Sequence, residues 1–134
     1  MAIITLTTDY GNKDYSVSSL KAKLISNIDN IRIVDITHDI SPFNLAEAGY
    51  VLEGAFNDFP KGTIHILSVD SELTPENRHI AIMYEGSFFI GADNGVFSLI
   101  FRDKNLIKLL KLTYTVIIII IFLLMNYLLK LHLT

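Results

Sequence analysis

Apolar runs that alternate with polar loops predict the elements of this chain. Five short runs rich in Ile, Val, Thr and Phe are typical of buried strands, and they span residues 2–6, 31–37, 63–69, 79–84 and 87–92. Apolar residues recur at helical spacing over 16–28 and 45–59, and residues 92–95 form a predicted turn or helix start before 96–101. This order predicts an α/β fold, with a mostly parallel sheet and helices on its faces.

The two longer helices have predicted core faces. In the first, Ser16 is a predicted N-cap, and Val17, Leu20, Leu24 and Ile28 recur on one side. The second is expected to bury the following set: Ala46, Gly49, Leu52, Ala55, Phe56 and Phe59.

Three polar loops follow the first three predicted strands. They read "TTDYGNKDYS", "THDISPFN" and "DSELTPENR", and each carries acids and hydroxyls directly after a strand end. Ligands of parallel α/β sheets bind outside the carboxyl ends of the strands. We therefore expect these loops to converge into one site.

Charge separates the chain into two parts. The 134-residue length favours one domain, yet residues 1–105 carry a net charge of −6 and residues 106–134 a net charge of +3. The acidic first part argues against a nucleic-acid partner, since phosphate binding needs clustered Lys and Arg. The absence of cysteine excludes disulfides and thiolate metal sites. The first residues lack the basic region of a signal peptide, so residues 1–105 are expected in the cytoplasm.

The last 29 residues have an unusual composition. Ile, Leu, Lys, Asn, Tyr and Phe make up 23 of them, and Gly, Ala, Pro, Asp, Glu and Arg do not occur. Residues 112–129 are uncharged and long enough for a membrane segment. A genuine anchor would be expected to use Ala and Gly, so the composition favours a frameshift or a truncated gene over an anchor. A buried element is the third interpretation.

Two pairs of residues are candidates for chemistry. Asp9, after the first strand, suits the two adjacent hydroxyls of a ribose, whereas the alternative is turn closure by Asp9 and helix capping by Asp14. Asp70 with Arg78 could orient and polarise a water, and the alternative is a surface salt bridge.

His38 lies three residues after Asp35. The two residues could form a catalytic pair or part of a metal site, but a hydrogen-bonded loop histidine is favoured. The histidine spacings match no metal motif, so no metal is expected.

Four stretches together resemble a known family. They are "LTTDYGNKDYSVSSLKAKL", "IVDITHDISPFNLAEAGYVL", "FPKGTIHILSVDSELTPENRHIA" and "GADNGVFSLIF". In order and spacing they resemble the N-terminal domain of the S-adenosyl-L-methionine hydroxide adenosyltransferases, over residues 2–102. The resemblance implies a Rossmann-like fold for residues 1–105. It also implies attack by water at C5′ of S-adenosyl-L-methionine, giving adenosine and L-methionine without a cofactor.

The resemblance also implies site residues. Asp70 and Arg78 match catalytic residues that orient and deprotonate the water, and Asp9 matches the carboxylate that holds the ribose. The remaining matches, on the substrate-binding side, are Asp14, Ser16, Phe43 and Asn94. Asp70 favours hydrolysis over the halide transfer of related halogenases.

Other family features concern the rest of the chain and its assembly. The family is trimeric, and its C-terminal β-barrel and a third catalytic residue, a histidine, are expected to be absent from this chain. We therefore expect either impaired hydrolysis or, alternatively, a non-catalytic or membrane-tethered adenosyl-binding module.

Overall fold

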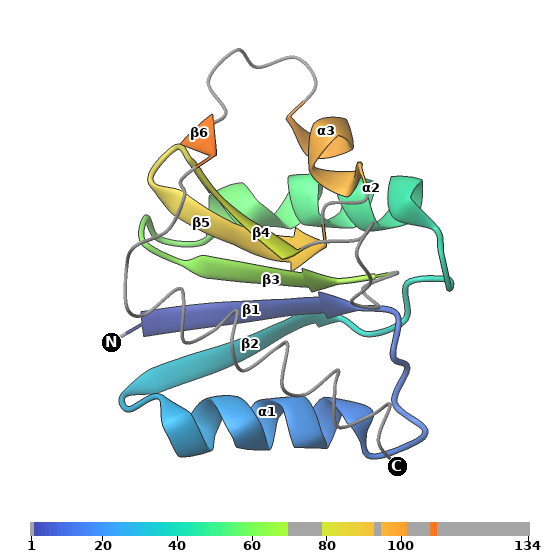
Figure 1. Ribbon diagram of the computed structural model, residues 1–134, viewed down its shortest axis with the longest axis vertical. Helices are drawn as coiled ribbons and strands as arrows, with labels where there is room; N and C mark the ends of the chain where they lie inside the picture. Colours follow the sequence, from blue (N-terminus) through green and yellow to red (C-terminus); the bar gives the residue numbers. More distant parts are fainter. Residues whose placement is uncertain (1, 70–78, 93–94, 102–107, 110–134) are drawn as a thin grey trace.

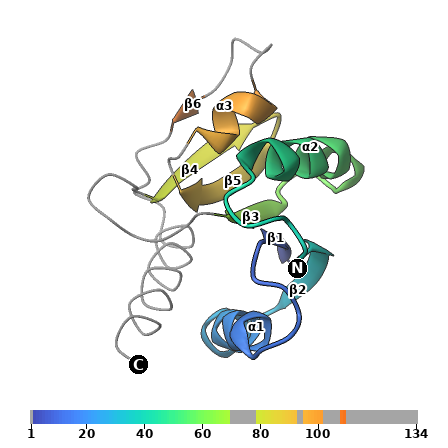
Figure 2. The same cartoon turned by 90° about the vertical axis from the view of Figure 1, so that its right-hand side faces the viewer.

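A central sheet lies between helices in the computed structural model, which describes residues 2–69, 79–92, 95–101 and 108–109. In chain order its elements are β1 (Ala2–Thr8), α1 (Ser16–Asn27), β2 (Ile31–Thr37), α2 (Leu45–Ala55), the 3₁₀ turn η1 (Phe56–Asp58), β3 (Ile64–Ser68), β4 (His79–Tyr84), β5 (Ser87–Ala92), α3 (Val96–Ile100) and β6 (Lys108–Leu109). Helix α1 covers one face of the sheet, and α2 and α3 cover the other (Figures 1 and 2). The predicted α/β class with helices on both faces is confirmed.

The sheet is mostly parallel. Within the described residues its strand order is β2-β1-β3-β5-β4-β6. Strand β1 pairs in parallel with β2 and β3, and β3 pairs in parallel with β5. Strand β4 is antiparallel to β5 and β6. Because β1, β2 and β3 run in the same direction, their carboxyl ends lie at one edge of the sheet, as the sequence predicted.

The face under α1 has an aliphatic core. Its buried members alternate along the strands and meet two leucines of the helix; they are Ile4, Leu6, Leu20, Leu24, Ile64, Ile66, Ala81 and Ile90. Val17 is buried as well, and Ile28 packs against the cluster from the end of the helix. The helical spacing predicted for this segment is therefore confirmed.

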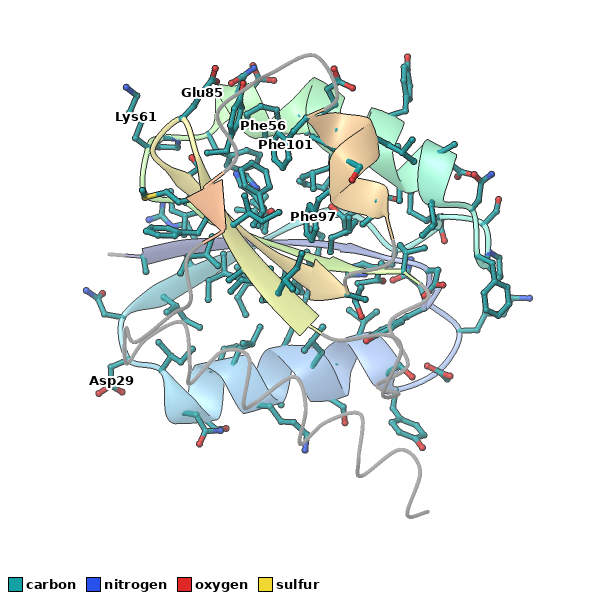
Figure 3. All side chains as sticks on the ribbon, turned by 45° about the horizontal axis from the view of Figure 1, so that its top comes forward. Asp29, Phe56, Lys61, Glu85, Phe97 and Phe101 are labelled. Carbon is teal, nitrogen blue, oxygen red and sulfur yellow. The ribbon has the colours of Figure 1, made fainter. Side chains whose placement is uncertain are left out.

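The face under α2 and α3 has an aromatic core. Its ring-bearing members are Phe56, Tyr84, Phe89, Phe97 and Phe101 (Figure 3 labels three of them). Phe89 is fully buried, and its ring contacts Phe56 and Phe101 edge-on, with centroids 5.3 and 5.0 Å apart. Such edge-to-face pairs add to the stabilisation that comes from burial alone.

Three details of the predicted helices are corrected. The second helix ends at Ala55 and continues as η1, because the chain tightens into a 3₁₀ turn before Pro60. Its buried face includes Ala48, whereas Ala46 is exposed, so one predicted core position was wrong. In the first helix Ser16 is already helical, and Tyr15 occupies the N-cap without a side-chain hydrogen bond.

The predicted membrane segment, residues 112–129, lies outside the described residues. Within the described ranges, no helix has the length and apolar character to cross a membrane. Strand β6 lies beyond residue 105, where the sequence predicted the domain to end. That boundary stays a prediction.

Candidate functional site

The loops that follow β1 and β2 and the end of β3 are joined by backbone hydrogen bonds at the carboxyl edge of the sheet. The N–H of Asp9 donates to the Ser68 carbonyl at 3.3 Å, and the N–H of Gly11 donates to the His38 carbonyl at 2.7 Å. Gly11 has φ +70°, a conformation that glycine adopts without a steric cost. The predicted convergence is therefore confirmed for the first two loops, whereas the third, residues 70–78, lies outside the described residues and its place stays a prediction.

A chain of side-chain hydrogen bonds supports this edge. The hydroxyl of Thr8, the last residue of β1, lies 2.7 Å from Nδ1 of His38. Nε2 of His38 lies 2.7 Å from Oδ1 of Asp35 on β2. Because an ionised carboxylate only accepts hydrogen bonds, His38 donates through Nε2 to Asp35.

This order of carboxylate, imidazole and hydroxyl is the order of a nucleophilic triad. Thr8, however, is fully buried, and its oxygen also accepts the N–H of Tyr10 at 3.3 Å. A substrate at the surface cannot reach that hydroxyl. The chain of bonds therefore ties the ends of β1 and β2 together, and the prediction that His38 is a hydrogen-bonded loop histidine is confirmed.

Asp35 is stabilised as a carboxylate. Partial burial raises its pKa, but hydrogen bonds and charge interactions with Lys21 and His38 outweigh burial, so the pKa is lowered overall. The Lys21 ammonium reaches Asp35 from α1 at 2.5 Å. Helix α1 is thus connected through Asp35 and His38 to the loop edge.

A second polar contact lies beside the first. The Tyr10 hydroxyl and the Ser68 hydroxyl are 2.6 Å apart, which joins the β1 loop to the end of β3. Thr8, Tyr10 and Ser68 were not singled out from the sequence. Their common signal is a hydroxyl at, or two residues after, the end of a buried strand.

The predicted residues of the first loop differ in their surroundings. Asp9 is half-buried directly after β1. Asp14 is exposed, and its Oδ1 accepts the N–H of Ser16 at 2.8 Å. This backbone hydrogen bond lowers the pKa of Asp14. Asp14 precedes the N-cap Tyr15, so this bond closes a turn at the start of α1, and it leaves carboxylate lone pairs available to a ligand.

Phe43, in the loop after β2, has its ring exposed. The residue is 74% accessible, and its backbone has φ +62°, which is uncommon for a residue with a side chain. The next residue, Asn44, caps α2 by accepting the N–H of Glu47 at 3.0 Å. The cap fixes the start of α2 and places Phe43 just before it.

The remaining predicted residues, Asp70, Arg78 and Asn94, lie outside the described residues, so their roles stay predictions. Within the described part of the chain, no group of three His, Asp or Glu residues could hold a metal ion.

A parallel α/β domain with polar loops at the carboxyl edge belongs to the class that binds small ligands there. Residues 4–118 match the family described as the SAM hydroxide adenosyltransferase N-terminal domain. The chain therefore belongs to this family, and the resemblance found in the sequence is confirmed.

Two similar proteins carry the same enzyme name. The (R)-S-adenosyl-L-methionine hydrolase of Methanocaldococcus jannaschii is 31% identical over 115 residues, which cover 82% of this chain and 43% of the relative. The enzyme of the same name from Thermus thermophilus is 29% identical over 99 residues, covering 74% of this chain and 38% of the relative. The chain thus spans less than half the length of these curated relatives.

A solved structure shows the same fold. The crystal structure of an uncharacterized conserved protein from Thermotoga maritima superposes with a TM-score of 0.69 at 33% sequence identity. The match covers 75% of this chain and 38% of that one.

Proposed function

We propose that this domain binds S-adenosyl-L-methionine at the carboxyl edge and takes part in its hydrolysis to adenosine and L-methionine. The observation that carries the proposal is the joining of the three strand ends around Asp9, in a chain with relatives named (R)-S-adenosyl-L-methionine hydrolase.

Asp9 is the proposed ribose ligand. A carboxylate has enough lone pairs to accept from both the 2′- and the 3′-hydroxyl. Its backbone is fixed by the bond from its N–H to Ser68, so the side chain starts from a rigid point at the end of β1. Asp14, on the same loop, and Ser16, the first residue of α1, are proposed contacts for the rest of the substrate.

Phe43 is the proposed aromatic wall. Its exposed ring, held by a loop at the carboxyl edge, offers a flat apolar surface to a purine. Asn94, after β5, is proposed to line the same pocket.

The proposed reaction needs little acid catalysis. Water attacks C5′, the new C5′–O bond forms as the C5′–S bond breaks, and the sulfonium sulfur keeps the electron pair as a neutral thioether. The water loses one proton, for which the Asp70 carboxylate is the proposed acceptor, with Arg78 keeping it ionised. The site must mainly orient and desolvate the water in line with the leaving group.

The test combines turnover and binding on the full chain. Incubation with S-adenosyl-L-methionine should release adenosine, measured by chromatography, and calorimetry should show adenosine binding. Asp9→Ala should weaken adenosine binding by about 100-fold, since it removes two hydrogen bonds to a charged group. Asp29→Ala is the control, because Asp29 is exposed in the turn before β2, at the opposite edge (Figure 3).

The outcomes separate the alternatives. Adenosine binding without adenosine release would leave a non-catalytic adenosyl-binding module. Equal affinity of Asp9→Ala and the unmodified chain would remove the ribose assignment.

A further inference from the structure

Ser68, the last residue of β3, contacts the turn that carries Asp9 in two ways. Its carbonyl accepts the N–H of Asp9 at 3.3 Å, and its hydroxyl lies 2.6 Å from the hydroxyl of Tyr10. Ser68 is 3% exposed, and Tyr10 packs against the aliphatic core under α1. Both partners of the hydroxyl contact are therefore held in place by their surroundings.

The two contacts with Ser68 differ in quality. Hydrogen bonds in proteins span about 2.5–3.0 Å for O–H···O and about 2.7–3.2 Å for N–H···O, so the hydroxyl contact is short for its type and the Asp9 backbone bond is long. The N–H of Tyr10 also donates over 3.3 Å, to the Thr8 hydroxyl. Of these three bonds, the hydroxyl pair holds the turn most firmly.

The hydroxyl of Tyr10 is not needed for the packing of its ring. A phenylalanine would fill the same space against the aliphatic core, but it could not form a hydrogen bond to Ser68. The hydroxyl therefore serves the link between the turn after β1 and the end of β3, and Asp9 lies in that link.

We propose that Tyr10 is a positioning residue for the ribose of the nucleoside, acting on Asp9 through its hydroxyl bond to Ser68. The bond holds the turn against the end of β3, so that the Asp9 carboxylate meets the 2′- and 3′-hydroxyls together. Binding groups act well only when they are held within about 0.5 Å of their productive geometry. This role of Tyr10 rests on the proposed function, because it acts on a carboxylate that is proposed to hold the ribose.

The experiment compares the affinities of the full chain for adenosine and for 2′,3′-dideoxyadenosine by calorimetry. The second ligand keeps the adenine and the sugar ring but lacks both hydroxyls that Asp9 would accept. The unmodified chain should bind adenosine about 100-fold more tightly, because dideoxyadenosine cannot form two hydrogen bonds to a charged group. The ratio of the two affinities does not respond to a change that weakens both ligands equally, such as a general loss of stability.

Two variants remove the hydroxyl pair from either side. Tyr10→Phe should lower the adenosine affinity about fivefold and leave the dideoxyadenosine affinity unchanged, so the ratio falls to about 20. Ser68→Ala removes the other partner and should give the same result. The double variant should match each single variant to within about twofold, since all three lack one and the same bond.

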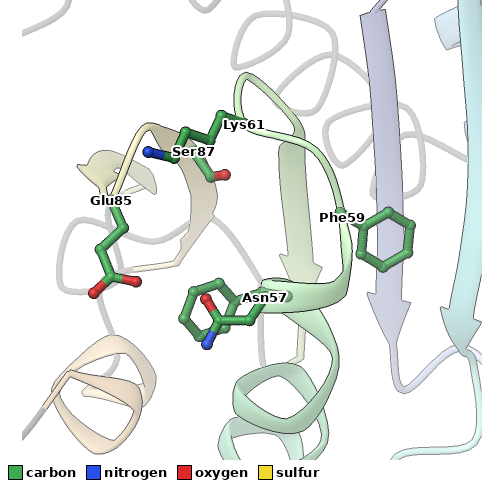
Figure 4. Close-up of a pocket in the computed structure, with 6 residues that line it drawn as sticks. Asn57, Phe59, Lys61, Glu85 and Ser87 are labelled. Atoms are coloured by element: carbon green, nitrogen blue, oxygen red, sulfur yellow. The ribbon is translucent and has the colours of Figure 1, made fainter.

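Two controls lie away from this turn. Tyr50→Phe removes a tyrosine hydroxyl from α2, where the residue is 81% accessible. Asn57→Ala alters a pocket of about 400 Å³ at the amino edge of the sheet, at the opposite end of β3 from Ser68 (Figure 4). Neither variant should change the affinity for either nucleoside.

The outcomes separate the role of Tyr10 from the proposed function. No adenosine binding, or equal affinities of the unmodified chain for the two nucleosides, would overturn the ribose role of Asp9 and the role of Tyr10 with it. A loss of adenosine affinity in Asn57→Ala would place the nucleoside in the other pocket and overturn both roles. A ratio that persists unchanged in Tyr10→Phe and Ser68→Ala would overturn the positioning role alone, and so would equal losses for both nucleosides.

Discussion

Two buried histidines of this domain make the same contact through Nδ1 and differ in the surroundings of the rest of the ring. Nδ1 of His38 lies 2.7 Å from the Thr8 hydroxyl, and Nδ1 of His65 lies 2.7 Å from the Thr5 hydroxyl. Both threonines belong to β1, and both imidazoles are almost fully buried. The difference between them therefore lies at the second ring nitrogen.

His38 has a polar partner on each side. Its Nε2 reaches Asp35, which is also held by Lys21 from α1. His65 has an apolar environment: its ring stacks on Phe89 with centroids 5.0 Å apart, and Phe56 and Phe59 approach edge-on. Its Nε2 has no hydrogen-bond partner within the described residues.

The comparison shows how burial alone and burial with a partner act on the same side chain. Without a charged partner, burial lowers the pKa of His65 to about 4, so the ring stays neutral in the aromatic core. His38 instead serves as a hydrogen-bonded link at the edge where the loops converge. The residue type, histidine, is the same in both roles, and the neighbouring residues distinguish them.

The largest expected effect on stability comes from removing the phenylalanine ring that stacks on His65. Phe89→Ala should lower the free energy of unfolding by about 4 kcal/mol, because it leaves a cavity against three other rings and His65. Denaturant titration measures the change. Phe43→Ala is the control, since that ring is exposed and should alter stability little. Similar losses from both variants would mean that the rings under α2 do not form a packed core.

A smaller effect is expected from the titration of His65. Below pH 6.5 the unfolded chain protonates this histidine, whereas the folded chain keeps it neutral down to about pH 4. Stability should therefore fall as pH is lowered through this window, with a loss of about 2 kcal/mol from this group by pH 5.

The matched variant is His65→Gln, which cannot titrate. Unfolding free energies of both chains at pH 7 and pH 5 give the difference, and the other three histidines contribute equally to each chain. If both chains lose the same free energy of unfolding between these pH values, the loss does not come from His65. The lowered pKa of His65 would then be wrong.

The smallest effect separates the two threonines. Thr5→Val and Thr8→Val each remove one buried hydrogen bond, at a cost of about 1 kcal/mol in stability. Thr8→Val also removes the acceptor of the Tyr10 N–H beside Asp9, so it should weaken adenosine binding by about fivefold, whereas Thr5→Val should leave it unchanged. Denaturation and adenosine calorimetry provide the two measurements. Equal losses of adenosine affinity in the two variants would show that the hydrogen bonds of Thr8 do not support adenosine binding more than that of Thr5.

Much of the fold could be predicted because it depends on local periodicity. Val17, Leu20 and Leu24 repeat at helical spacing, and all three are buried under the sheet. The turn at Glu85-Gly86 separates β4 from β5, as predicted. The exposure of Ala46 could not be predicted, because whether an apolar side chain is covered depends on distant residues.

The candidate site shows the same limit. The position of Asp9 after a strand follows from the pattern, and so does the expectation that loops meet at the carboxyl edge. The bond between Tyr10 and Ser68 spans 58 positions along the chain, and the bond between Thr8 and His38 spans 30. The spacing of residues along the chain does not predict contacts between positions so far apart.

The sequence by itself determined the order of the elements, the direction of the first three strands and the family to which the chain belongs. These depend on short-range periodicity and on motifs that are continuous in the chain. Only the tertiary structure decided that His38 links β1 to β2 at the site, while His65 lies neutral among phenylalanine rings. The reason is physical: the state of a buried imidazole is set by burial and by the charges within a few ångströms, and packing brings those neighbours from distant parts of the chain.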